Sequence, residues 1–253
     1  MSHHDTATSN GQLAHFIDEG TNDIEPIVML PGGSLNISYL GPLSKSLVAA
    51  GHRTVRIDAV HHKDDVTMHD LADDVVAVMD ELALPKSWIA GHAFGNRVAR
   101  TVALDYPDRV LGIILLAAGG TVAPSDEAKE ALKTAFSDVP EKQAEESMVY
   151  FVGDPKDADK AWDGVKDARD PSLGAMQRQA NISTPPDEWA RISPETTAII
   201  IQGSHDQIAP PANGEQLAAK NPDNTRLLSL KGAGHLFPMI RPDETAKLIV
   251  DNI

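Results

Sequence analysis

Residues 91–95, with the sequence GHAFG, constrain the fold of this chain more than any other segment. They follow a short apolar stretch at 87–90 that is predicted to be a buried strand, and they lead into a predicted helix at 94–106. The two outer glycines allow a sharp turn to close between strand and helix without side-chain clashes. The pattern therefore predicts a strand–turn–helix unit that holds its middle residue, Ala93, above the end of the strand.

Strands and helices are predicted to alternate on both sides of this unit. The predicted strands are 13–18, 27–30, 54–58, 87–90, 110–116, 197–202 and 225–230, and the predicted helices are 43–50, 69–82, 94–106, 212–220 and 242–252. The run at 110–116 is apolar throughout, which is typical of a strand covered on both faces. The alternation predicts an α/β fold with a mostly parallel sheet flanked by helices, and a site at the carboxyl ends of the strands.

The segment 121–194 departs from this alternation, because charged residues and prolines interrupt its apolar pattern. Helices are predicted near 126–136, 141–151 and 171–181, and no strand is predicted there. Since the segment leaves the carboxyl end of a strand, we expect it to form a helical cap over the site, inserted in a single domain of residues 1–253. Its larger apolar side chains either line a pocket or form a small core of the cap itself: Met148, Tyr150, Phe151, Trp162, Met176 and Trp189.

The composition disfavours several function classes. The formal net charge of −15 opposes binding to nucleic acid and to anionic membrane surfaces. With no cysteine, the chain has no disulfide, thiolate metal site or cysteine nucleophile. No apolar run is long enough to span a membrane, and the polar start, residues 1–11, lacks the order of a signal peptide and is expected to be a loose tail. We therefore expect a cytoplasmic protein that acts on a small-molecule substrate; the sequence does not set its oligomeric state.

Four local patterns follow one another along the chain. They are the turn at 91–95, YPDRV at 106–110, GSHDQIAP at 203–210 and GAGH at 232–235. Together they resemble the α/β-hydrolase fold superfamily, in which a strained G-x-S-x-G turn presents a nucleophile and later loops bear an acid and a histidine. The resemblance spans about residues 12–253. It implies an α/β-hydrolase fold with a helical cap insertion, and it implies no cofactor.

The resemblance also implies a role for each matching residue. His235 corresponds to the general base, and Asp206 corresponds to the acid that orients it. The backbone amides of Phe94 and Gly33 correspond to the two donors of an oxyanion hole. Ala93 stands at the nucleophile position, where its methyl group can neither attack nor lose a proton.

Four further residues are expected to contact the substrate. Gly32 and Ser34 lie in the loop after the second predicted strand, and His61 follows the third. His92 precedes the turn residue and is expected to pack beside the turn rather than to react. His61 is flanked by a second histidine and followed by two aspartates, but consecutive residues of an extended chain point in opposite directions, so no metal site is expected.

Three explanations of Ala93 remain open. A natural serine was replaced to trap a substrate or product; or the alanine is natural and His235 activates a water that attacks directly; or the protein has lost its chemistry and binds a ligand or partner. Further departures from the superfamily pattern, at Pro31, at Asn96 and in the loop 59–62, favour a natural alanine. Ser34 and Ser38 are conceivable substitute nucleophiles, although neither lies on a strained turn of this pattern.

We therefore expect an α/β-hydrolase-type enzyme that hydrolyses a small neutral or hydrophobic ester, lactone or related carbonyl compound. Its catalysis would use the His235–Asp206 pair and the oxyanion hole. A non-catalytic ligand-binding protein of the same fold is the first alternative. A lyase or isomerase that uses His235 as a base is the second.

Overall fold

The computed structural model describes residues 2–7, 13–21, 24–59 and 65–253, and its central feature is one eight-stranded sheet. The strands are β1 (Ser2–Ala7), β2 (Leu13–Glu19), β3 (Ile24–Leu30), β4 (His52–Ala59), β5 (Ser87–His92), β6 (Val110–Leu116), β7 (Ala198–Gly203) and β8 (Thr225–Leu230). Their order across the sheet is β1-β2-β4-β3-β5-β6-β7-β8. The strands β4 to β8 and β3 pair in parallel, and β1 and β2 pair antiparallel at one edge. This arrangement confirms the predicted α/β class with a mostly parallel sheet.

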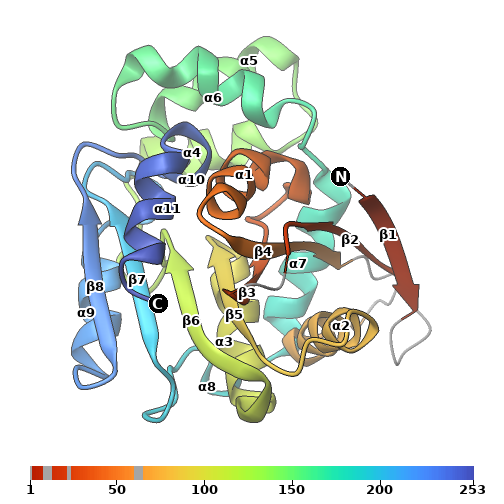
Figure 1. The fold of residues 1–253 in the computed structure, drawn as a ribbon. Coiled ribbons are helices and arrows are strands. Elements are labelled where there is room, and N and C mark those ends of the chain that lie inside the picture. The colour runs from red at the N-terminus through yellow and green to blue at the C-terminus, as the bar shows by residue number, and fades with distance from the viewer. Residues whose placement is uncertain (1, 8–12, 22–23, 60–64) are drawn as a thin grey trace.

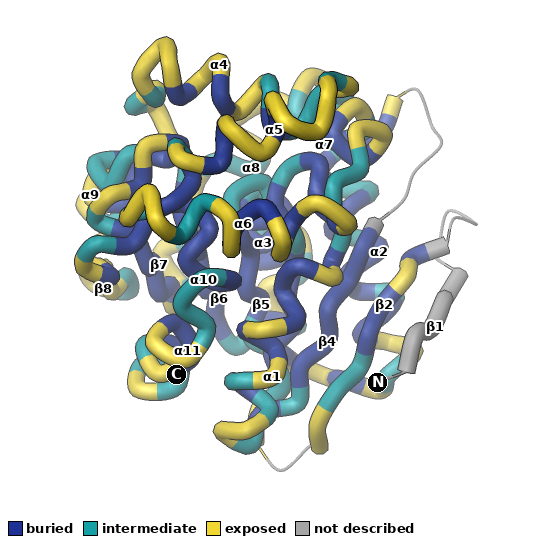
Figure 2. The backbone as a smooth tube through the Cα atoms, turned by 90° about the horizontal axis from the view of Figure 1, so that it is seen from above, coloured by how far each residue is buried: buried dark blue, intermediate teal, exposed yellow. Residues whose placement is uncertain are grey.

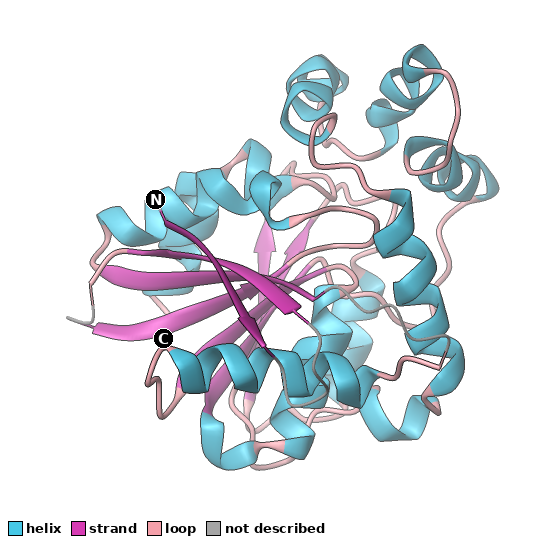
Figure 3. Cartoon of the chain, turned by 90° about the vertical axis from the view of Figure 1, so that its right-hand side faces the viewer, coloured by secondary structure: helices cyan, strands magenta, loops and turns pink. Residues whose placement is uncertain are grey.

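Helices cover both faces of the sheet (Figure 3). The helices outside the segment 121–194 are α1 (Gly41–Ala49), α2 (Met68–Glu81), α3 (Gly95–Asp105), α9 (Ala212–Ala219), α10 (Phe237–Ile240) and α11 (Pro242–Val250). The apolar side chains of α1, α10 and α11 pack on one face, and those of α2, α3 and α9 pack on the other. Strand residues alternate accordingly: Ile27 and Met29 join the first of these cores, while Val28 and Leu30 join the second. The central strands are buried and exposed residues lie on the outer helices (Figure 2).

Local signals in the sequence account for where helices begin. Thr67 precedes α2 and accepts a hydrogen bond from the backbone of Asp70, whose carboxylate accepts one from the backbone of Thr67 in return. Asp170 precedes α7 (Pro171–Ser183) and accepts from the amide of Ser172, with proline in the first turn. These two caps satisfy amide groups that the helix itself leaves without partners.

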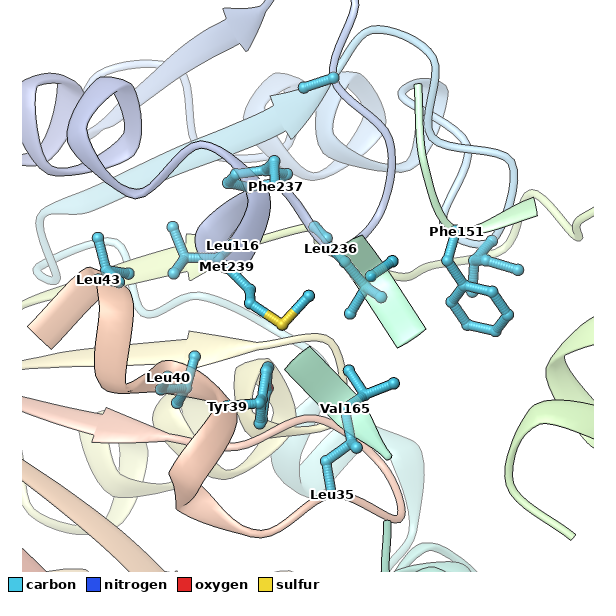
Figure 4. Packing of buried hydrophobic residues seen from close by; sticks show 14 of the residues in the cluster. Leu35, Tyr39, Leu40, Leu43, Leu116, Phe151, Val165, Leu236, Phe237 and Met239 are labelled. Carbon is cyan, nitrogen blue, oxygen red and sulfur yellow. The ribbon is translucent and has the colours of Figure 1, made fainter. Parts of the chain in front are cut away.

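Five helices lie between β6 and β7, in the segment 121–194 that we call the insertion. They are α4 (Asp126–Ala135), α5 (Glu141–Ser147), α6 (Ala158–Val165), α7 and α8 (Pro186–Trp189), with short 3₁₀ helices η3 (Met148–Tyr150) and η4 (Pro155–Asp157). In Figure 1 the helices α4, α5 and α6 lie beyond the carboxyl ends of β6 and β7. Figure 4 shows Val165 and Phe151 of the insertion beside Tyr39, Leu236 and Met239 of the sheet's own loops and helices, so the insertion shares its apolar contacts with the core below it.

The structure corrects several sequence-based boundaries. Residues 2–7, within the expected loose tail, form the edge strand β1, which pairs with β2 from Ser2–Asp18 to Ala7–Leu13. The strand β3 begins at Ile24 rather than at residue 27, because its first residues pair with β4 across an irregular register. The helices α6, α8 and α10 were not predicted; α8 and α10 have four residues each and are too short to show a helical period. Among the residues described, no helix is both long and apolar enough to cross a bilayer.

Candidate active site

The turn after β5 has the strained geometry that its sequence predicts. Ala93 has a φ of +48°, a left-handed conformation that costs a non-glycine residue about 1–2 kcal/mol. A Cβ atom on Gly91 would lie 2.2 Å from the carbonyl oxygen of Gly95, and one on Gly95 would lie 2.5 Å from that of Leu30. Both glycines are therefore needed for the backbone to pass this closely.

Asn96 holds this turn against the neighbouring strand. Its Nδ2 donates to the carbonyl oxygens of Gly91 at 2.9 Å and of Leu116 at 2.8 Å, and the residue is fully buried. The amide of Ala93 donates to the same Leu116 carbonyl at 3.0 Å. The asparagine that departs from the superfamily pattern thus ties the turn to the end of β6.

The structure brings His235 and Asp206 together in the loops that follow β8 and β7. The Nδ1 atom of His235 lies 2.9 Å from Oδ2 of Asp206, and both residues are buried. The other oxygen, Oδ1, accepts hydrogen bonds from the amides of Ile208 and Ala209 at 2.9 and 2.8 Å. The carboxylate is therefore fixed from both sides, and it can hold the imidazole in one tautomer and orientation.

A cavity of about 230 Å³ separates the turn from this pair. Its lining includes His235, Ala93 and the two residues expected to form an oxyanion hole, Phe94 and Gly33. Within the part of the chain that the structure describes, the backbone amides of Phe94 and Gly33 have no hydrogen-bond acceptor. A histidine, two unoccupied amide donors and an apolar wall in one cavity can activate a nucleophile and stabilise an oxyanion.

A chain of buried hydrogen bonds connects the loop after β3, the turn and the histidine loop. The amide of Gly32 donates to the Tyr39 hydroxyl at 2.6 Å, the hydroxyl lies 2.8 Å from Nδ1 of His92, and Nε2 of His92 lies 3.0 Å from the carbonyl oxygen of His235. This order has the Tyr39 hydroxyl donating to His92, which donates in turn to His235. Burial, with the nearby charge of His235, lowers the pKa of His92 to about 3, so its ring is neutral.

Of the residues expected to contact the substrate, some line the cavity and others do not. Gly32 and His92 line the cavity, but their polar atoms are engaged in the hydrogen-bond chain through Tyr39. Ser34 lines an adjoining cleft instead, and its amide donates to Gln177. Ser38 is exposed and donates to Asn36, so it does not replace the missing nucleophile. His61 lies outside the described residues.

Sequence reasoning missed three polar residues of this cavity. Arg97 and Arg100 of α3 and Asn181 of α7 all contribute to its lining. The signal was present in the spacing, because positions four and seven residues after Ala93 return to the same face of the following helix. Of the aromatic and methionine residues weighed above, Phe151 lines the cavity, while Met148 and Trp162 are buried in the core.

The described residues around this cavity form no metal-binding arrangement. Among the described residues, no group of three or more histidine, aspartate or glutamate side chains is placed to hold a metal ion. The polar groups that line the cavity are two imidazoles, two guanidinium groups, an amide side chain and backbone amides.

Comparisons with known proteins agree with this fold. The sequence model of the alpha/beta hydrolase family matches residues 27–248, a range that contains all four motifs. Rhodomycin D methylesterase DnrP of Streptomyces peucetius is 26% identical over 259 residues, covering 85% of this chain and 86% of that protein. The solved structure of serine hydrolase CCSP0084 from Cycloclasticus zankles has a TM-score of 0.77 at 17% identity, covering 98% of this chain and 96% of the other. A thermophilic esterase from Thermogutta terrifontis has a TM-score of 0.76 at 23% identity, covering 99% and 97%.

Proposed function

This chain belongs to the alpha/beta hydrolase family, and from that membership we propose that it hydrolyses a small ester, lactone or related carbonyl compound with a largely apolar body. The observation that supports this most is the hydrogen-bonded His235–Asp206 pair, which shares one cavity with the free amides of Phe94 and Gly33. The methylesterase similarity points to the same reaction class. The helices of the insertion would act as a cap that encloses the substrate.

The proposed mechanism has no covalent intermediate, because Ala93 cannot attack. A water molecule entering with the substrate would transfer a proton to Nε2 of His235 as its oxygen bonds to the carbonyl carbon. The oxyanion that forms would accept hydrogen bonds from Phe94 and Gly33, and Asp206 would stabilise the imidazolium. Collapse of the intermediate would break the bond to the leaving group, which would take the proton back from His235.

The test compares the chain as it stands with Ala93→Ser and His235→Ala on a panel of p-nitrophenyl esters. We expect slow turnover by the unaltered chain, because an oxyanion hole and binding alone can retain about 10³–10⁴-fold catalysis over water. His235→Ala should lower kcat by about 10²-fold or more, as loss of a general base does. The matched control is His205→Ala, which removes an exposed histidine of the neighbouring loop and should leave turnover unchanged.

Ala93→Ser separates the remaining possibilities. If this variant alone gains turnover and labelling by a fluorophosphonate, the site is built for a serine and the direct water mechanism is wrong. If none of the variants hydrolyses any ester, hydrolysis is wrong as the function. The ligand-binding alternative would then be favoured, because the cavity persists without a nucleophile.

A further inference from the structure

Two arginines of α3 carry buried positive charge into the wall of the cavity. Arg100 is 4% exposed and Arg97 is half-buried, and both line the cavity beside the turn. In the described part of the chain, neither forms an ion pair with a carboxylate. Burial lowers the pKa of both groups, and for Arg100, with repulsion from Arg97 added, the pKa falls to about 10.

The partners of these arginines are all neutral. Arg97 donates to Oδ1 of Asn181, and Arg100 donates to the backbone carbonyl oxygens of Asn96 at 3.2 Å and Ala190 at 2.8 Å. Both guanidinium groups also lie over the ring of Trp189, at 4.9 and 5.3 Å from its centroid. A guanidinium has five N–H donors, so these contacts leave donors of both arginines available to a further acceptor in the cavity that they line.

Two neighbouring arginines with only neutral partners destabilise the fold unless an anion binds beside them. A charge removed from water is normally paired, because an uncompensated buried charge destabilises the fold. Two like charges in adjacent turns of one helix add to that cost. An anionic group of a bound ligand would compensate both arginines at once, and it would do so at a wall of the cavity that holds His235.

The approach to the cavity is also basic, although the chain as a whole is strongly acidic. A cleft of about 730 Å³ between α4 and α7 shares five lining residues with the cavity, among them Gly33, Phe94 and Asn181. Its charged lining consists of Lys129, Lys133, Arg178 and a single acid, Asp138. The two lysines form exposed pairs with acids of their own helix, whereas Arg178 has no ion-pair partner among the described residues. A cleft lined mainly by one sign of charge concentrates ligands of the opposite sign.

We propose that the substrate carries a carboxylate, which Arg97 and Arg100 bind while its apolar body lies against Leu132, Phe136 and Phe151. This inference rests on the proposed function and narrows it: a substrate with one negative charge replaces the neutral one expected from the sequence. A planar carboxylate suits the fork of a guanidinium, which binds it through two parallel hydrogen bonds. The carboxylate end would thereby place the carbonyl end toward His235.

Binding measured by calorimetry tests the proposal without requiring turnover. The probes are phenylbutyrate and its uncharged isostere phenylbutyramide, titrated into the unaltered chain. We expect the carboxylate to bind at least tenfold more tightly, because hydrogen bonds to charged groups contribute about 1.5–3 kcal/mol. Equal affinities, or no binding of either probe, would overturn the proposal. Tighter binding of phenylpropyl phosphate than of phenylbutyrate would overturn the assignment to a carboxylate. Since no bond is broken, the result is independent of whether the chain hydrolyses esters.

The variant Asn181→Asp separates ligand recognition from a purely structural role of the arginines. It places a carboxylate beside Arg97 with almost no change of shape, so we expect a higher thermal midpoint and loss of the preference for phenylbutyrate, with phenylbutyramide binding unchanged. The control is Gln179→Glu, which adds the same charge to the same helix away from the cavity lining. If Asn181→Asp stabilises the fold but leaves the preference for phenylbutyrate as it is, the arginines serve only to hold Trp189 and the proposal is wrong.

Arg97→Gln should weaken phenylbutyrate binding about tenfold if the proposal is right.

Discussion

At the level of single residues, the strained conformation of Ala93 is maintained by neighbours that do not react. Asn96 ties the turn to β6, and the hydrogen-bond chain from Gly32 through Tyr39 to His92 ties it to the loops on either side. Because His92 then donates to the carbonyl of His235, one buried chain joins the amide loop to the proposed base. The site is therefore preorganised by contacts that remain whether residue 93 is alanine or serine.

Tyr39→Phe tests this hydrogen-bond chain. Removing one hydroxyl leaves the amide of Gly32 and Nδ1 of His92 buried without partners, and each unsatisfied group costs about 1–3 kcal/mol. We expect the free energy of unfolding in urea to fall by about 2 kcal/mol or more. Ester turnover should fall as well, since the loop that carries Gly33 loses its anchor.

Tyr150→Phe is the matched control for Tyr39→Phe. Tyr150 is half-buried in η3, and its hydroxyl has no hydrogen bond among the described residues. The same loss of a hydroxyl should therefore change the free energy of unfolding by less than about 0.5 kcal/mol. If both variants lose the same stability and turnover, the chain through Tyr39 does not organise the site.

The site residues that lie in recognisable local motifs could be predicted from the sequence. The residues that contribute to the site through their buried contacts were missed. Asp206 and His235 stand in short loops with recognisable neighbours, so their positions could be inferred without a structure. Tyr39 and Arg100 stand in ordinary contexts, and their contribution depends on which side chains surround them in the folded chain. No sequence pattern indicates that an arginine will be buried without a carboxylate.

At the level of elements, the strands and helices with a clear local pattern were likewise predicted, and those that depend on tertiary contacts were missed. The strand β6 is a continuous apolar run whose predicted bounds are those of the structure, because a strand buried on both faces needs no partner information to be recognised. The edge strand β1 is polar in sequence and pairs with β2. This pairing could not be predicted from the local composition of residues 2–7. In the insertion, the short helices α6 and α8 form where tertiary contacts support them.

His69 links three helices, and we expect its protonation to make the attachment of α8 depend on pH. His69 of α2 lies 2.6 Å from Asp105 at the end of α3 and 2.9 Å from Glu188 of α8. Its hydrogen bond with Asp105, together with the one to Glu188, raises the pKa of His69 above its ordinary value. A raised pKa in the folded state means that the contribution to stability is complete below the unfolded value of about 6.5 and is lost as pH rises through the folded value.

His69→Gln should therefore destabilise the protein more at acidic than at alkaline pH. The measurement is the thermal midpoint of the variant and the unaltered chain across the range in which histidine titrates. We expect the difference between the two to be largest below about pH 6.5 and to vanish at alkaline pH. His205→Gln, which changes an exposed histidine with no side-chain partner among the described residues, should show no such trend. A difference that is constant with pH would mean that the ion pairs of His69 do not stabilise the fold.

At the level of the whole molecule, the insertion packs into the apolar core on the face of the sheet that carries α1, α10 and α11. Val165 of α6 and Phe151 belong to the same buried cluster as Leu116 of the sheet (Figure 4), and Ile199 of β7 belongs to it as well. The contact is also made by backbone: the amide of Leu236 donates to the carbonyl oxygen of Phe151 at 3.0 Å, directly beside His235. Packing of this kind predicts that the insertion and the sheet unfold as one cooperative unit, in keeping with the single domain expected for residues 1–253.

Val165→Ala tests that cooperativity. The residue is fully buried, and losing two methyl groups should lower the free energy of unfolding by about 2 kcal/mol. Fluorescence of Trp162 reports the insertion and that of Trp88 reports β5, so single-tryptophan variants allow both regions to be followed during unfolding in urea. We expect coincident transitions that shift together, as in two-state unfolding. The exposed Val149→Ala should shift neither. If the Trp162 transition moves alone, the insertion unfolds separately, and the buried cluster that joins it to the sheet does not couple the two.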